Sequence, residues 1–101
     1  MESRIYDLTR RDAKTLPERA LKLAEEAGEV AQAVLSATNA PGSAYKGLGL
    51  ADVREEAADA AIVALSILAQ TCDSETVFRS ELERLMTVKC AKWEAVLGQN
   101  A

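Results

Sequence analysis

The sequence predicts an all-α protein, a compact helical bundle of about four helices in which two long central helices carry acidic motifs. Hydrophobic residues make up 49% of the chain, much of that fraction is alanine, and aromatic residues are only 4%. Chains rich in alanine with few glycines and prolines favour closely packed helices. Valine, isoleucine and threonine never form an alternating run, so no strand is predicted.

The chain of 101 residues is the size of one domain, and we interpret residues 1–101 as a single helical unit. A chain this small buries only a modest fraction of its surface when it folds alone. We therefore expect the bundle to be completed by oligomerisation, as a homodimer or homotetramer.

The first long helix has the clearest start signal. Residues 1–14 are predicted to be an arm with a short helix over Leu8–Lys14. Thr15 and Glu18 then fit a capping box, and Pro17 falls in the first turn, where proline is tolerated. The helix is predicted to run to about Ala37, and its core face is expected to hold apolar residues at helical spacing: Leu16, Ala20, Leu23, Ala27, Val30 and Val34.

A loop over residues 39–50 is predicted to follow, because prolines and glycines gather there. The second long helix is expected to begin at Asp52 as its cap and to end near Gln70. Its stretch Ala57–Ala69 is apolar almost all round, which is typical of a buried helix.

A last helix is predicted from a cap at Asp73 or Ser74 to about Leu97. Its apolar side begins with Phe78 and Leu82 and continues through Leu85 and Met86. Two lysines extend that same side by further turns: Lys89 and Lys92.

Composition excludes several function classes. The net charge is −4 and no stretch is densely basic, which disfavours duplex nucleic acid as a partner. The absence of histidine excludes Ser-His and Cys-His catalysis. No apolar run is long enough to span a membrane, no signal peptide is recognisable, and the two cysteines lack zinc spacing. A cytoplasmic protein without a membrane partner is therefore expected.

Two acidic pairs lie on the long helices. Glu26 and Glu29 are three residues apart, as are Glu56 and Asp59, so each pair lies together on a helix surface. Like charges at this spacing repel unless a cation lies between them, and Mg²⁺ prefers oxygen ligands. We predict a magnesium site of these four carboxylates, with Mn²⁺ as a substitute and Glu25 orienting or deprotonating the attacking water. The alternative is a solvated acidic face without a metal.

Substrate phosphates would need cations near such a site. Lys46, Lys89 and Lys92 are the candidates, and Tyr45 offers an aromatic face in the predicted loop. The alternative is that the lysines are solvated and that Tyr45 packs against the protein.

The segments LAEEAGEVAQA and REEAADAAIVAL resemble the MazG-like all-α nucleoside triphosphate pyrophosphohydrolases, which carry an ExxE…ExxD signature. The resemblance covers about Leu16–Ala69, and KCAKWEAVL is similar to the family's basic last helix. Residue by residue, the family's additional glutamate falls on Glu25, and its metal ligands fall on Glu26, Glu29, Glu56 and Asp59.

The resemblance implies a helical dimer or tetramer that hydrolyses a nucleoside triphosphate, or a related nucleotide, to the monophosphate and pyrophosphate with Mg²⁺. It also implies a role in clearing damaged or surplus nucleotides. The sequence leaves open a second function, a catalytically silent helical oligomer that binds nucleotide or metal as a sensor or partner module. A purely structural bundle with acidic surface decoration is the third alternative.

Overall fold

Four α-helices and one 3₁₀ turn form the regular structure of residues 1–99, the part of the chain that the computed structural model describes. They are α1 (Glu2–Arg11), α2 (Leu16–Ala37), η1 (Ala44–Lys46), α3 (Leu50–Gln70) and α4 (Glu75–Gln99). Residues 1–99 contain no strand, so the all-α class and the number of helices are confirmed. None of the helices in this range has the length and apolar character that crossing a membrane requires.

The N-terminus is more helical than predicted. Residues 2–7 belong to α1 instead of a loose arm, and the helix ends at Arg11, before Lys14. The sequence shows little apolar periodicity here, because only two side chains of this helix, Ile5 and Thr9, are buried.

Local capping fixes the start of α2 as the sequence predicts. Thr15 N donates to Glu18 Oε1 at 2.9 Å, and Glu18 N donates to Thr15 Oγ1 at 3.2 Å. These two bonds satisfy backbone donors that a helix start leaves unpaired. At the other end Asn39 has φ of 58°, a left-handed conformation that asparagine tolerates and that terminates the helix.

The start of α3 differs from the prediction by three residues, because the cap is Gly49 instead of Asp52. The helix begins at Leu50, and Asp52 lies inside its first turn, where Oδ2 accepts a hydrogen bond from Gly49 N at 2.8 Å. Asp52 therefore stabilises the helix start from within. For α4 the predicted cap at Ser74 is confirmed, because Val77 N donates to Ser74 Oγ at 3.1 Å.

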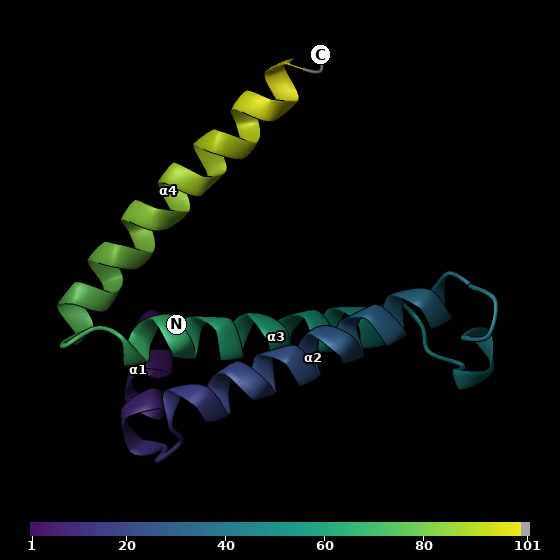
Figure 1. Ribbon diagram of the computed structural model, residues 1–101, viewed down its shortest axis with the longest axis horizontal. Coiled ribbons are helices and arrows are strands. Elements are labelled where there is room, and N and C mark those ends of the chain that lie inside the picture. The colour runs from purple at the N-terminus through teal and green to yellow at the C-terminus, as the bar shows by residue number, and fades with distance from the viewer. Residues whose placement is uncertain (100–101) are drawn as a thin grey trace.

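Helices α2 and α3 form an antiparallel hairpin closed by the η1 segment, and they make the most extensive contact in the chain (Figure 1). Helix α1 packs on α3 beside the far end of that hairpin. Helix α4 starts at this end too, but it runs away from the hairpin and makes no contact with α2 within residues 1–99 (Figure 1).

The apolar core lies where α1, α3 and α4 meet. It consists of Ile5, Ala69, Cys72 and Phe78, with half-buried residues packed around it: Tyr6, Leu65, Leu68 and Leu82. The Tyr6 and Phe78 rings stack with centroids 6.1 Å apart. This core anchors the first turns of α4 and leaves the rest of that helix in solvent, since every residue from Met86 to Gln99 is exposed.

Two predicted buried faces are only partly covered within one chain. The side chains of α2 that are buried are Arg19, Glu26, Ala33 and Ser36, whereas Leu16 and Val34 of the expected core face are 41% and 39% exposed. On α3, Ile62 is 53% exposed and several alanines of the apolar stretch are exposed as well. The predictions of full burial are therefore wrong for the single chain, because α2 turns polar side chains toward α3.

Phe78 holds α4 to the rest of the chain, and Phe78→Ala is expected to lower the free energy of unfolding by about 3–5 kcal/mol, since its ring is fully buried. The neighbouring Val77→Ala is the control, because Val77 is 43% exposed and its truncation should change stability by less than about 1 kcal/mol. Urea unfolding followed by circular dichroism measures both. Equal effects of the two variants would contradict this description of the core.

Candidate metal centre

The hairpin brings together the carboxylates of both acidic motifs. Glu26, Glu56 and Asp59 each offer an oxygen, and these oxygens lie within 4.8 Å of one another. A second group, Glu25, Glu26 and Glu29, meets the same criterion. Glu26 belongs to both groups and so lies at the centre of the site, which we call the carboxylate cluster: Glu25, Glu26, Glu29, Glu56 and Asp59.

Helix geometry explains this placement. Glu26 and Glu29 are one turn apart on α2, and Glu56 and Asp59 are one turn apart on α3. Because α2 and α3 run antiparallel, two such pairs near the middle of the hairpin meet across the helix contact. The fold thus groups Glu26, Glu56 and Asp59 across the two helices, and it places Glu29 beside Glu26 on α2 and near Glu56.

Two oxygens of the cluster lack any partner. Glu26 is 6% exposed, and its Oε2 is buried without a hydrogen bond to residues 1–99. Glu56 Oε2 is buried and unpaired in the same way. Buried, unpaired carboxylate oxygens are costly, and a hard divalent cation with oxygen ligands would satisfy both of them. The donor set present thus fits Mg²⁺ or Mn²⁺.

The electrostatics of Glu56 report the same crowding. A hydrogen bond shared with the Glu29 carboxyl raises the pKa of Glu56 above its ordinary value of 4.5. Burial and repulsion from Glu29, Asp59 and Glu26 raise this pKa further. The fold therefore holds like charges close enough for one proton, or one metal ion, to be shared between them.

Lys22 is the residue beside the carboxylate cluster that sequence reasoning missed. Its Nζ lies 3.2 Å from Glu26 Oε1 and 3.5 Å from Glu25 Oε1. The hydrogen bond with Glu26 and the charge of Glu25 raise the pKa of Lys22. The signal was present in the sequence, because Lys22 precedes Glu26 by four residues and so shares its helix face.

Glu25 is exposed at the edge of the cluster, and its carboxylate is free to reach solvent on one side. This position suits a group that handles a proton of water better than one that holds a metal from all sides. Its role stays a prediction.

Tyr45 and Lys46 are not brought to the cluster within one chain. Both belong to η1 at the closed end of the hairpin, where Lys46 Nζ lies 5.5 Å from the centre of the Tyr45 ring. Glu29 precedes the end of α2 by eight residues, about 12 Å along the helix axis. Tyr45 is 80% exposed, so it does not pack against the described part of the chain.

Lys89 and Lys92 lie in the exposed part of α4, which has no contact with α2 in residues 1–99. Within one chain they are therefore separated from Glu26 and Glu29. Substrate binding by Tyr45 and by the three lysines of the sequence analysis stays a prediction, and it would need either a second chain or a movement of these segments.

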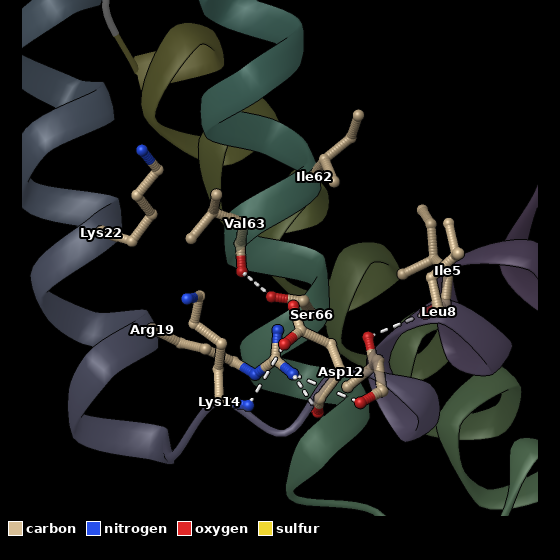
Figure 2. Close-up of a pocket in the computed structure, with 10 residues that line it drawn as sticks. Ile5, Leu8, Asp12, Lys14, Arg19, Lys22, Ile62, Val63 and Ser66 are labelled. Carbon is tan, nitrogen blue, oxygen red and sulfur yellow. Dashed lines mark hydrogen bonds between the residues drawn. The ribbon is translucent and has the colours of Figure 1, made fainter.

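A hollow of about 260 Å³ adjoins the cluster on the side of α1. Figure 2 shows Lys14 and Lys22 on one side of it and Ile5 and Leu8 of α1 on the other. Arg19 lies at its base, where it donates hydrogen bonds to Gln70 Oε1 and to the backbone oxygens of Thr9 and Asp12. Lys22 lines this hollow and also pairs with Glu26, so it connects the hollow to the carboxylate cluster.

Glu56 should make stability depend on pH in a predictable direction. A carboxyl whose pKa is raised on folding contributes stability below its unfolded pKa, and this contribution is lost as the pH rises through the folded pKa. In EDTA, Glu56→Gln should therefore gain melting temperature relative to the parent protein as the pH rises above about 4.5. If the melting temperatures of the two proteins changed in parallel from pH 4 to 7.5, the crowding of Glu56 would be contradicted.

Added Mg²⁺ should raise the melting temperature of the parent protein at neutral pH, because a metal that binds the folded state stabilises it.

Comparison with models of protein families, with curated proteins and with solved structures found no match for this chain. The features of this chain that bear on function are therefore its motif residues and the geometry of the carboxylate cluster.

Proposed function

We propose that this protein is a Mg²⁺-dependent nucleotide pyrophosphohydrolase that converts a nucleoside triphosphate, or a related nucleotide, to the monophosphate and pyrophosphate. One observation carries the proposal. Two antiparallel helices bring four motif carboxylates together around two buried oxygens that have no partner within residues 1–99. The ExxE…ExxD resemblance supports the same reaction, and it adds the clearance of damaged or surplus nucleotides in the cytoplasm as the proposed role.

The chain's own residues suit this reaction. Glu26, Glu29, Glu56 and Asp59 would hold the metal, which when bound supplies charge neutralisation and water activation. Glu25 orients the attacking water and accepts its proton, while the water oxygen bonds to phosphorus and the bond from that phosphorus to the pyrophosphate oxygen breaks. The leaving pyrophosphate retains the electron pair of that bond.

The proposed enzyme is a homodimer or homotetramer. Helices α2 and α3 leave apolar residues such as Leu16, Val34 and Ile62 exposed, and α4 leaves Trp93 67% exposed. The radius of gyration is 16.4 Å, against about 13 Å for a typical domain of 100 residues, because α4 projects from the hairpin. A second copy would cover these faces.

A catalytically silent module that binds nucleotide or metal is the second candidate. It is favoured by one observation, the position of Lys46, Lys89 and Lys92 away from the carboxylate cluster within the single chain. Binding of Mg²⁺ and nucleotide without release of product would identify this function.

The reaction itself is tested by measuring pyrophosphate release from a panel of ordinary and modified nucleoside triphosphates, with Mg²⁺ and with EDTA. Release of pyrophosphate and monophosphate in equal amounts, only with the metal, is the expected result. Folded protein that binds Mg²⁺ and releases no pyrophosphate from any nucleotide would contradict the proposed activity.

Asp59→Asn should abolish the pyrophosphate release, by at least about a hundredfold in kcat, while the protein stays folded, because an amide is nearly isosteric but is a poor ligand for Mg²⁺. Glu55→Gln is the matched control, since Glu55 is exposed on the same helix and belongs to neither carboxylate group. Steady-state kinetics with circular dichroism compare the two. Near-normal turnover in Asp59→Asn would sink the assignment of the metal ligands.

The oligomer is tested by Val34→Glu, which places a charge on the exposed apolar face of α2. Sedimentation equilibrium should give a dimer or tetramer for the parent protein and a smaller species for the variant, because burying an unpaired charge is costly. Thr38→Glu is the control, since Thr38 is exposed just beyond the end of α2. A monomeric parent protein would refute the proposed assembly.

A further inference from the structure

The carboxylate cluster has one ion-paired cation among residues 1–99. Lys22 pairs with Glu25 and Glu26, and no other lysine or arginine lies within 4.0 Å of a cluster carboxylate. Its side chain is 47% exposed, whereas that of Glu26 is 8% exposed. Lys22 therefore reaches a buried acid from solvent, along its flexible stem.

Lys22 shares Glu26 with the proposed metal. Its ammonium lies on Oε1 of Glu26, while Oε2 of the same carboxylate is the buried oxygen without a partner. A divalent cation at the cluster would stand within a few ångströms of this ammonium, and two cations at that distance repel. Binding of the metal would therefore weaken the ion pair between Glu26 and Lys22.

The hollow beside the cluster offers Lys22 a second position. Lys14 and Lys22 both line this hollow, and both also line a neighbouring one with Glu18, Leu21 and Glu25. Lys14 forms no ion pair within residues 1–99. Arg19 already donates three hydrogen bonds to other parts of the chain. Lys14, which has no carboxylate partner in this range, and Lys22, which has two, thus flank the same space (Figure 2).

We propose that Lys22 is an exchangeable counter-ion, which neutralises Glu25 and Glu26 in the metal-free protein and turns to the phosphate chain of the substrate when the metal is bound. The phosphate chain then lies on the α1 side of the cluster, with Lys14 as its second cation. This inference rests on the proposed function and names the phosphate-binding residues of that site. Lysine suits the task, because its ammonium is a compact charge with three donors on a long stem.

The proposal gives Lys22 opposite effects on two ligands. In Lys22→Met, which keeps most of the stem and removes the charge, Mg²⁺ alone should bind more tightly, by about threefold to fivefold. Inorganic tripolyphosphate, at a fixed free Mg²⁺ concentration that saturates each protein, should bind more weakly by about fivefold or more. Isothermal titration calorimetry measures both ligands. Lys14→Met should weaken tripolyphosphate with little change for Mg²⁺.

Two further variants make the result decisive. Lys22→Arg keeps the charge and should restore most of the tripolyphosphate affinity. Arg84→Met is the control for lost surface charge, because Arg84 pairs with Glu81 on α4 and should leave both affinities unchanged. A purely structural role of Lys22 would weaken both ligands together.

The outcomes separate this inference from the proposed function. Mg²⁺ binding by the parent protein, with unchanged tripolyphosphate affinity in Lys22→Met, would overturn the inference and leave the metal site standing. Failure of the parent protein to bind Mg²⁺ would overturn the proposed function and this inference with it.

Discussion

The burial of Glu26 between α2 and α3 is the constraint on which the rest of the hairpin depends. A buried carboxylate is costly unless it is paired, and Glu26, which is 6% exposed, meets Glu56 and Asp59 across the helix contact and has only Lys22 as an opposite charge. Lys22 offsets part of that charge from the solvent side, and the raised pKa of Glu56, caused first by the neighbouring Glu29 carboxyl, reflects the charge that is left. The contact between α2 and α3 therefore surrounds a group of carboxylates that repel one another unless a cation lies between them.

This arrangement accounts for the orientation of α2. The side chains of Arg19, Glu26 and Ser36 are buried, and each of them interacts with a neighbouring segment. Arg19 joins α1 and α3, and Ser36 Oγ accepts a hydrogen bond from Leu48 N at 3.0 Å, which fastens the closing loop. The apolar side of α2 is consequently left for another surface. Specificity of the hairpin thus comes from polar groups, and the apolar face remains available for assembly.

The sequence predicted the parts that local physics determines. Thr15, Glu18 and Ser74 form caps from their own short-range hydrogen bonds, and the i,i+3 spacing of the acidic pairs fixes their faces. The direction of α4 was beyond the sequence, because it depends on how the Tyr6 and Phe78 rings stack and on Arg10 donating to the backbone oxygens of Cys72 and Asp73. Apolar periodicity predicts that a helix face is buried, but it does not identify the surface that covers this face. Val34 and Ile62 were therefore assigned to a core that a single chain does not form. Lys22 was overlooked because a lysine four residues before a glutamate is common on helix surfaces.

Arg19 connects α1, α2 and α3 through hydrogen bonds that do not depend on pH. Its guanidinium is buried, and its acceptors are an amide oxygen and two backbone carbonyl oxygens, none of which titrates. Arginine keeps its charge throughout the range in which proteins are handled. The hydrogen bonds that join the end of α1 to the two long helices are therefore kept in acid. The hydrogen bonds of Arg19 are thus independent of pH, in contrast to the Glu56 carboxyl, whose pKa is raised by its neighbours.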